Sequence, residues 1–243
     1  MNFFRKIKKF LISPETTKIL KFLLDEFLPP ILRDQRWFFG PIVKIFNARM
    51  DIDFKRKAPF MSEKEFQAAY ENVAQSRETD MTMGTIEWVL ENLFGKNILE
   101  VGSGNGIVSI ACAKKGLDVT ALDLAKANFD EVRLRAKTEN VKIKLKTANI
   151  ENLPFKNKEF DTTLCLHTLE HVRNLPEAIH ELKRVTKKRL ILVVPRQRYY
   201  LYTCDYHLNF FGNSEQLILV MKIKNAQCRI IDGSLCYLGD ISN

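Results

Sequence analysis

The sequence lacks several features that would assign it to a special class of protein. No run of 18 or more apolar residues occurs among its 243 residues, so a membrane-spanning helix is not expected. The five cysteines include no CxxC pair, which argues against a zinc site, and their odd number argues against a disulfide framework. The first 13 residues mix charged and apolar residues, unlike a secretory signal. These absences predict a globular protein of the reducing cytoplasm.

What the sequence does have is positive charge, concentrated near the N-terminus. Residues 1–60 hold 13 Lys and Arg against 6 Asp and Glu, so +7 of the net charge of +9 lies there. Residues 2–12 combine this charge with apolar residues at helical spacing, which leaves two interpretations. The helix either contacts a membrane surface, as a peripheral anchor, or packs on its own domain with a solvated basic face. Nucleic acid is not expected as a partner, because no recognisable nucleic-acid-binding module accompanies the charge.

The first 80 residues predict a helical extension or lid, followed by the main domain over residues 81–243. Residues 33–50 are rich in aromatic side chains, and Gly40-Pro41 is expected to break this stretch. Ser62 and Glu65 form a capping-box pattern, which marks the start of a helix. Helices are expected over residues 2–12, 16–27, 63–74 and 82–92.

From residue 97 the pattern changes to strands that alternate with helices. Strands are expected over residues 97–101, 117–124, 141–146, 161–167 and 189–194, and helices over residues 107–115, 125–139 and 176–187. Repeated strand–helix units of this length predict an α/β domain with a doubly wound, mainly parallel sheet.

The most informative stretch is ILEVGSGNG, residues 98–106, where a buried strand runs into a glycine turn. Glycines let backbone N–H groups approach a ligand closely. The spacing is G-x-G-x-G, whereas a nicotinamide enzyme would show G-x-G-x-x-G. Asp123 ends the next strand, where an acid accepts hydrogen bonds from ribose hydroxyls; its alternative role is the N-cap of the following helix. The pair favours a cofactor that contains adenosine.

Three motifs in order carry a family resemblance. They are ILEVGSGNG, then LDL, then ANIENLPFKNKEFDTTLCLHTLEHV, within residues 85–195. Together they resemble the class I S-adenosylmethionine-dependent methyltransferases, in particular the small-molecule, type 11-like subgroup. The resemblance implies a Rossmann-like fold, S-adenosylmethionine as cofactor, and methyl transfer to an O or N atom of a small-molecule acceptor.

The resemblance also implies a cofactor site. In this family Glu100 would order the glycine loop, Asp123 would bind the ribose, and Asn149 would contact the adenine amino group. Asn149 departs from the family pattern, which has an acid here, but its carbonyl can still accept a hydrogen bond. The cofactor-binding residues implied in this way are Glu100, Gly102, Ser103, Gly104, Asn105, Asp123, Leu124, Asn149, Ile150 and His167.

Three further residues are candidates with an alternative role each. Arg77 is a candidate partner of the cofactor carboxylate, or a surface charge on a loop. His171 is a candidate general base facing the acceptor, or a residue that supports its loop. His207 is a second candidate base, or a packing residue. No cluster of residues at metal-ligand spacing is present, so no metal is expected.

The acceptor is the open question at this stage. The basic amphipathic start favours a lipid or a membrane-linked glycan intermediate. Two rival functions stay open: an NAD(P)-dependent Rossmann oxidoreductase, and a non-catalytic partner protein that binds the cofactor without turnover.

Overall fold

The computed structural model describes residues 27–46, 51–74, 81–202 and 206–241. Contacts divide the chain into two compact units. The first unit contains Met1–Phe60 and Gln197–Leu208, and the second contains Met61–Arg196 and Asn209–Asn243. The helices expected over residues 2–12 and 16–27 lie outside the described residues, except that Phe27 is in a turn. The domain boundary expected after residue 80 stays a prediction.

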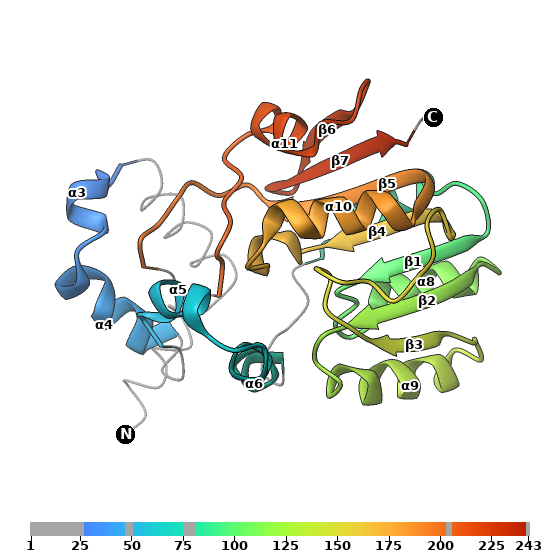
Figure 1. The fold of residues 1–243 in the computed structure, drawn as a ribbon, viewed down its shortest axis with the longest axis horizontal. Helices are drawn as coiled ribbons and strands as arrows, with labels where there is room; N and C mark the ends of the chain where they lie inside the picture. Colours follow the sequence, from blue (N-terminus) through green and yellow to red (C-terminus); the bar gives the residue numbers. More distant parts are fainter. Residues whose placement is uncertain (1–26, 47–50, 75–80, 203–205, 242–243) are drawn as a thin grey trace. The chain divides into compact units, whose positions relative to one another are not determined.

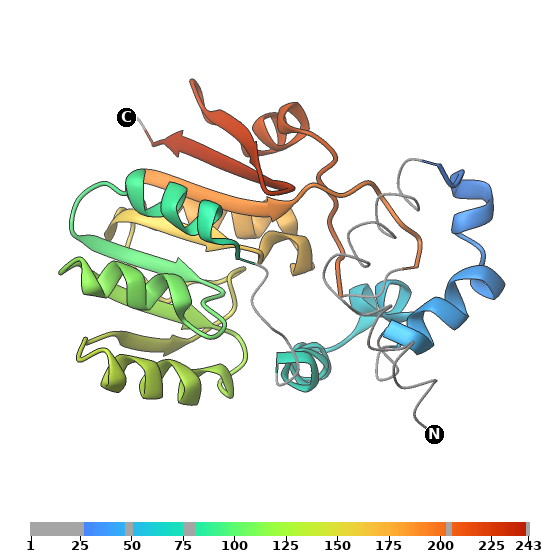
Figure 2. The ribbon, with the colours of Figure 1, turned by 180° about the vertical axis from the view of Figure 1, so that it is seen from behind.

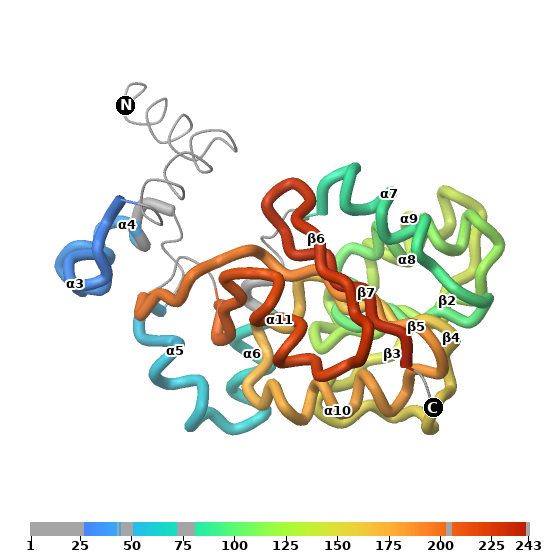
Figure 3. Tube along the Cα trace, turned by 90° about the horizontal axis from the view of Figure 1, so that it is seen from above, coloured from blue at the N-terminus to red at the C-terminus, as the bar shows by residue number. Residues whose placement is uncertain are grey.

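The second unit is built on one seven-stranded sheet with the order β3-β2-β1-β4-β5-β7-β6 (Figure 1). Its strands are β1 (Asn97–Val101), β2 (Asp118–Asp123), β3 (Lys144–Thr147), β4 (Phe160–Leu166), β5 (Thr186–Pro195), β6 (Gln227–Ile231) and β7 (Ser234–Asp240). The pairs from β3 to β5 are parallel, and β7 is antiparallel to both β5 and β6. Figure 1 shows β6 and β7 beyond β5 at one edge of the sheet, and Figure 3 looks onto this edge, with β6 and β7 in front of the other strands. The predicted mainly parallel, doubly wound sheet is therefore confirmed.

Helices cover both faces of this sheet, because side chains of its central strands alternate between the faces. The helices of this unit are α6 (Glu63–Ala74), α7 (Met83–Glu91), α8 (Ile107–Lys114), α9 (Asn128–Thr138), α10 (Leu175–Val185) and α11 (Ser214–Met221). One core joins α10 and α11 to Leu99 and Val101. The other joins α7 and α8 to Ile98. Figures 1 and 2 show α10 and α8 on opposite faces.

Local sequence signals set the ends of several helices. Ser62 and Glu65 form the expected capping box: Glu65 N donates to Ser62 Oγ at 3.3 Å, and Ser62 N donates to Glu65 Oε2 at 2.7 Å. The Ser62 hydroxyl, which donates to Glu65 Oε2 at 2.7 Å, and then Ser62 N hold the pKa of Glu65 below its ordinary value. Thr82 caps α7 by accepting from Thr85 N at 3.2 Å. The expected helix starts near residues 63 and 82 are therefore confirmed.

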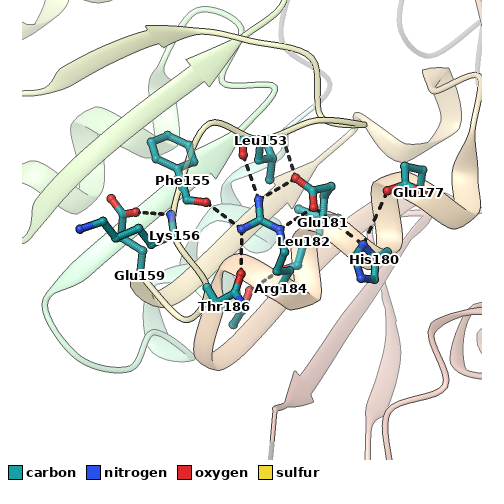
Figure 4. A network of polar contacts seen from close by, with 11 residues as sticks. Leu153, Phe155, Lys156, Glu159, Glu177, His180, Glu181, Leu182, Arg184 and Thr186 are labelled. Atoms are coloured by element: carbon teal, nitrogen blue, oxygen red, sulfur yellow. Dashed lines mark hydrogen bonds and ion pairs between the residues drawn. The ribbon is translucent and has the colours of Figure 1, made fainter.

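The loop that carries the LPF motif is held by one arginine on α10 (Figure 4). Arg184 donates to the carbonyl oxygens of Leu153 at 2.9 Å and Phe155 at 2.7 Å. Its guanidinium also bonds Glu181, whose Oε2 accepts from Leu153 N at 2.7 Å. The arginine beside Glu181 holds the pKa of that carboxyl below its ordinary value. Loop and helix are thus joined by charge-assisted hydrogen bonds, the stronger kind.

The first unit contains short helices and a segment from much later in the chain. Among its described residues, the helices are α3 (Pro30–Arg33), α4 (Arg36–Phe46), α5 (Phe54–Lys57) and the 3-10 turn Ala58–Phe60. The buried Arg33 donates to Tyr199 O at 2.7 Å, and its guanidinium stacks 4.0 Å from the centre of the Tyr200 ring. Lys55 Nζ donates to Tyr200 O at 2.6 Å. Side chains of α3 and α5 therefore hold Tyr199 and Tyr200.

The predicted interruption at Gly40-Pro41 is wrong, because α4 runs through both residues. A proline costs an interior helix one N–H donor, and its ring normally also clashes with the Cβ of the residue before it. Gly40 has no Cβ, so the clash between the proline ring and the preceding residue's Cβ does not arise here. Within the described part of the chain, no helix has the length and hydropathy needed to span a membrane.

Candidate cofactor pocket

A pocket in the second unit lies at the carboxyl ends of β1, β2 and β4. The chain leaves β1 for β2 on one side and reaches β4 on the other, so this is the switch point where open α/β sheets bind ligands. The pocket lining includes the predicted residues Glu100, Gly102, Ser103, Gly104, Asn105, Asp123, Leu124, Asn149, Ile150, His167 and His171. Arg77 lies outside the described residues. The fold therefore brings together predicted residues from four separate strand ends and loops.

One wall of the pocket is formed by residues 100–106 and 123–125, which we call the glycine wall. Gly102 has a φ of +75°, and a Cβ there would overlap the side chain of Thr168. Gly104 has a φ of +50°, but a Cβ there would meet nothing within 4 Å. Gly102 is therefore required by packing, whereas Gly104 leaves open space on the pocket side of the turn.

Asp123 joins the two halves of the glycine wall. Its Oδ2 accepts from Gly104 N at 2.8 Å and its Oδ1 accepts from Ala125 N at 2.8 Å. Burial raises the pKa of this carboxyl, and the backbone hydrogen bonds oppose that effect. The N-cap of α9 is Ala127, so the alternative role of Asp123 as that N-cap is wrong. Hydrogen bonds from the Asn128 side chain and from Leu124 N lower the pKa of this carboxyl as well.

Glu100 connects the strand before the glycine turn to the helix after it. The carboxylate accepts a hydrogen bond from the Ser109 hydroxyl on α8, and the residue is only 3% exposed. Burial is the main cause that raises the pKa of Glu100 to about 7, and the Asp123 charge adds to it. The carboxyl therefore changes its charge near neutral pH, next to a turn whose shape it supports.

The opposite wall is formed by residues 61–71, which we call the α6 wall. Phe66 and Tyr70 line the pocket. Gln67 Nε2 donates to Leu124 O at 3.3 Å, and Asn149 Nδ2 donates to Glu63 Oε1 at 3.0 Å. Arg173 further secures the wall, because its guanidinium donates to Met61 O at 2.8 Å and stacks 4.6 Å from the centre of the Phe66 ring.

Sequence reasoning placed none of these α6 residues in the site. In the sequence, residues 63–74 predict only an amphipathic helix with a capped start, and nothing in such a pattern says what the apolar side will cover. The capping box and the helix were the available signal, and they specify the element but not its partner.

The histidines differ in how they relate to the pocket. His167 directly follows β4 and has a φ of +47°, and its Nδ1 lies 3.5 Å from Glu170 Oε1. His171 Nε2 lies 3.9 Å from the same oxygen, and its ring centre is 5.6 Å from that of Tyr70. His207 belongs to the first unit, where its Nδ1 lies 2.6 Å from Gln197 Oε1. It is not among the residues that line the pocket. The base role of both candidates stays a prediction.

Two pocket atoms bear on whether a polar ligand fits. Ser103 Oγ and His167 Nε2 are buried, and neither has a hydrogen-bond partner among the described residues. Buried polar groups are rarely left without partners, because their desolvation then goes uncompensated. Together with the open side of Gly104, these atoms suit a ligand that carries its own polar groups into the pocket.

Comparisons with known proteins identify the domain that carries this pocket. Residues 99–194 match a family model described as a methyltransferase domain. The ubiquinone biosynthesis O-methyltransferase of Idiomarina loihiensis is 40% identical over 98 residues, which cover 40% of each chain. The enzyme of the same name from Alkalilimnicola ehrlichii is 34% identical over 99 residues, again 40% of each chain. Residues 99–194 belong to the class I methyltransferase family.

The likeness in fold extends beyond this methyltransferase domain. A SAM-dependent methyltransferase of Thermotoga maritima superimposes with a TM-score of 0.54 at 16% identity, covering 78% of this chain and 98% of that one. At this identity the match concerns the fold alone. The chain spans about 40% of the length of the curated relatives that it matches. The expected family and fold of the methyltransferase domain are thus confirmed.

Proposed function

We propose that this chain is an S-adenosylmethionine-dependent methyltransferase that transfers a methyl group to an oxygen atom of a small molecule. The observation that carries the proposal is the glycine wall, with Asp123 at its centre, in a methyltransferase domain. The relatives' names favour oxygen as the acceptor atom over the nitrogen that the sequence resemblance also allowed. The pocket residues fit the cofactor, because they leave unpaired polar atoms and open space at the glycine turn.

Different pocket residues would contact the cofactor and the methyl acceptor. When bound, the cofactor supplies a methyl group on a positively charged sulfur. Asp123 would accept from the ribose hydroxyls, and the open side of Gly104 would admit the amino-acid tail beside Ser103 Oγ. His171 is the candidate general base: one of its ring nitrogens would take the proton from a hydroxyl of the acceptor. Orientation and exclusion of water by these walls can contribute on the order of 7–11 kcal/mol to such a transfer.

Calorimetric titration with S-adenosylmethionine, S-adenosylhomocysteine and NAD tests the cofactor assignment. The full chain should bind both adenosyl ligands and not NAD. Asp123→Asn should weaken adenosyl binding by at least tenfold, because it removes the charge that accepts the ribose hydroxyls. Asp118→Asn, at the exposed start of the same strand, is the matched control and should bind normally.

Each other outcome of the titration supports a rival. Binding of NAD in place of the adenosyl ligands would support the oxidoreductase. Adenosyl binding without turnover across a panel of hydroxylated acceptors would support the non-catalytic partner protein. A folded chain that binds neither ligand would refute the proposed cofactor.

We further infer that the acceptor is a lipid or a membrane-linked glycan intermediate, met at a membrane surface. Large apolar side chains of the first unit stand in solvent: Phe27 is 71%, Ile31 75% and Trp37 70% exposed. The Arg36 side chain, beside Trp37 in the sequence, is 62% exposed. Aromatic and aliphatic groups with basic neighbours suit an interface with anionic lipid headgroups. The basic residues 2–12 would add positive charge to a contact with anionic lipid.

Flotation with lipid vesicles tests the membrane contact in the full chain. A larger fraction of the protein should float with vesicles that contain anionic lipid than with neutral vesicles. The variants Ile31→Ser and Trp37→Ser should each reduce flotation severalfold, and so should deletion of residues 1–12. Leu219→Ser changes an exposed leucine of the second unit and serves as the control. Unchanged flotation of all three altered chains would refute the proposed contact with a membrane surface.

A further inference from the structure

The first unit has a cavity of its own, which we call the arginine cavity. It is lined by residues 27–30, which lead into α3, by Arg33 and Asp34 at the end of that helix, and by Arg198 and Tyr199. All of these residues belong to the same compact unit. Residues 27–30 read Phe-Leu-Pro-Pro, so four apolar residues share one hollow with two arginines and one carboxylate.

The guanidinium of Arg33 is fixed in place, but its hydrogen bonds are incomplete. Nε donates to Asp34 Oδ1 at 3.2 Å, Nη2 donates to Tyr199 O at 2.7 Å, and the flat face stacks on the Tyr200 ring. The third nitrogen, Nη1, makes no hydrogen bond to any described residue. Because Arg33 is only 3% exposed, little water can replace the missing partner of this buried cation. An anion in the cavity would supply that partner.

The charges in and beside the arginine cavity are mainly positive. Arg33 and Arg198 line it together with one acid, Asp34, whose Oδ1 already accepts from Arg33. Lys55 lies beside the lining, with its Nζ 3.8 Å from the centre of the Tyr199 ring. A guanidinium matches the oxygens of a phosphate in geometry as well as in charge. Two arginines at one cavity therefore favour a phosphate group as the anion.

The apolar residues of the lining indicate the rest of the ligand. Phe27 is 71% exposed, Leu28 is half-buried, and the two prolines that follow are exposed. A free phosphate ion would leave these side chains in water. A phosphate joined to a hydrocarbon chain would contact both parts of the lining, because the chain would remove apolar surface from water while the phosphate meets the arginines.

We propose that the arginine cavity binds the phosphate group of a lipid, with Arg33 and Arg198 as the donors and residues 27–30 as the contact for the hydrocarbon chain. The inference rests on the proposed membrane contact of the first unit and deepens it, because it names the chemical group of the lipid that the protein recognises. It also gives Arg33 a binding role besides its hydrogen bond to Tyr199 O.

Calorimetry on the full chain with octyl phosphate, inorganic phosphate and octanol tests the inference, with each ligand kept below the concentration at which it aggregates. Octyl phosphate carries both parts of the proposed ligand, whereas each of the other two carries one. Octyl phosphate should bind at least tenfold more tightly than either, because its charge and its chain both find partners in the lining.

Two matched charge changes separate the cavity from the general positive charge of the unit. Arg198→Gln should weaken octyl phosphate binding three- to tenfold, because it removes one donor from the lining. Lys44→Gln removes the same charge from an exposed position on α4 outside the lining, and should change binding by less than twofold. Arg33→Lys keeps the charge but loses the planar group, and should weaken binding at least as much as Arg198→Gln. Arg198 is exposed, so its variant tests the cavity even where Arg33→Lys disturbs buried contacts.

A further variant tests the contact with the hydrocarbon chain. Leu28→Ser replaces an apolar side chain of the lining by a polar one. It should weaken octyl phosphate binding severalfold and leave the weaker binding of inorganic phosphate unchanged, because the arginines are untouched.

Three results would overturn the inference. Inorganic phosphate that binds as tightly as octyl phosphate would show a site for a free anion, and octanol that binds as tightly would show a site for apolar groups alone. Equal losses in Arg198→Gln and Lys44→Gln would show attraction to the overall charge of the unit.

The outcomes also keep this inference apart from the proposed function. A wild type that binds S-adenosylhomocysteine and floats with anionic vesicles, but does not bind octyl phosphate, refutes the inference alone. A wild type that binds octyl phosphate but no adenosyl ligand supports the arginine cavity and refutes the proposed cofactor.

Discussion

The two walls of the pocket are built by different means. The glycine wall is made of backbone N–H groups from residues close in the chain; Gly104 N and Asp123 are 19 positions apart. The α6 wall is made of side chains whose partners lie 57 to 112 positions away. A wall of backbone groups depends on a few conformations that side chains disrupt. A wall of side chains can be altered one contact at a time, with the fold retained.

The largest effect should come from adding one methyl group to the glycine wall. Gly102→Ala combines a positive φ with an overlap on Thr168, so it should cost about 3 kcal/mol of unfolding free energy or more. Gly104→Ala meets no atom and should cost about 1 kcal/mol, yet weaken adenosyl binding at least tenfold by filling the open side of the turn. Chemical denaturation and calorimetry measure the two effects. Equal stability losses would contradict the packing argument.

A second prediction concerns the pH dependence of stability from Glu100. Its folded-state pKa of about 7 exceeds the ordinary value of 4.5, so the folded state keeps a proton that the unfolded state releases. The contribution of the Glu100 proton to the free energy of unfolding is therefore complete below about pH 4.5. It is lost as the pH rises to about 7, on the order of 3 kcal/mol in all.

Glu100→Gln removes this titration and keeps an acceptor for the Ser109 hydroxyl. Thermal unfolding between pH 5 and pH 8 should show a smaller loss of Tm with rising pH than in the wild type. The control variant Glu91→Gln changes an exposed residue on α7, and its Tm should depend on pH as that of the wild type does. An identical pH slope in Glu100→Gln and the wild type would show that Glu100 does not carry the effect.

The α6 wall should respond in binding more than in global stability. Phe66 is only 5% exposed and lines the pocket beneath the Arg173 guanidinium. Phe66→Ala should weaken adenosyl binding about tenfold while the midpoint of global unfolding changes little, because a helix outside the sheet can open locally. Hydrogen exchange of α6 amides, compared with that of β1 and β4, measures the difference. A matching loss of protection in the sheet would show that the two walls are not separable.

The smallest effect should come from the Tyr70 hydroxyl. It donates to His171 O at 3.4 Å, which is long for a hydrogen bond with a hydroxyl donor. Tyr70→Phe keeps the ring beside His171 and should change adenosyl binding by about twofold or less. Tyr70→Ala removes the ring as well and should act like Phe66→Ala. A large effect of the Phe variant would assign Tyr70 a role beyond packing.

Sequence reasoning worked best where local rules decide the structure. The strand over residues 97–101 has the same bounds in the structure, and the other four predicted strands lie within a few residues of theirs. It missed α11 and the β6–β7 hairpin, although Asp232-Gly233 is a hairpin signal; both residues have a positive φ, 49° and 84°. It was wrong at Pro41, where Gly40 allows the helix to continue.

Most of the candidate site was also predictable, because its residues sit at strand ends that a parallel sheet brings to one edge. Hydrophobic periodicity, the glycine turn and the acid after the second strand depend on neighbours along the chain, and the sequence alone determined them. The α6 wall, the Arg184 contacts to the LPF loop and the Glu63–Asn149 hydrogen bond were decided only by the tertiary structure. Each joins residues from separate elements, and no local pattern records which elements meet when the core packs.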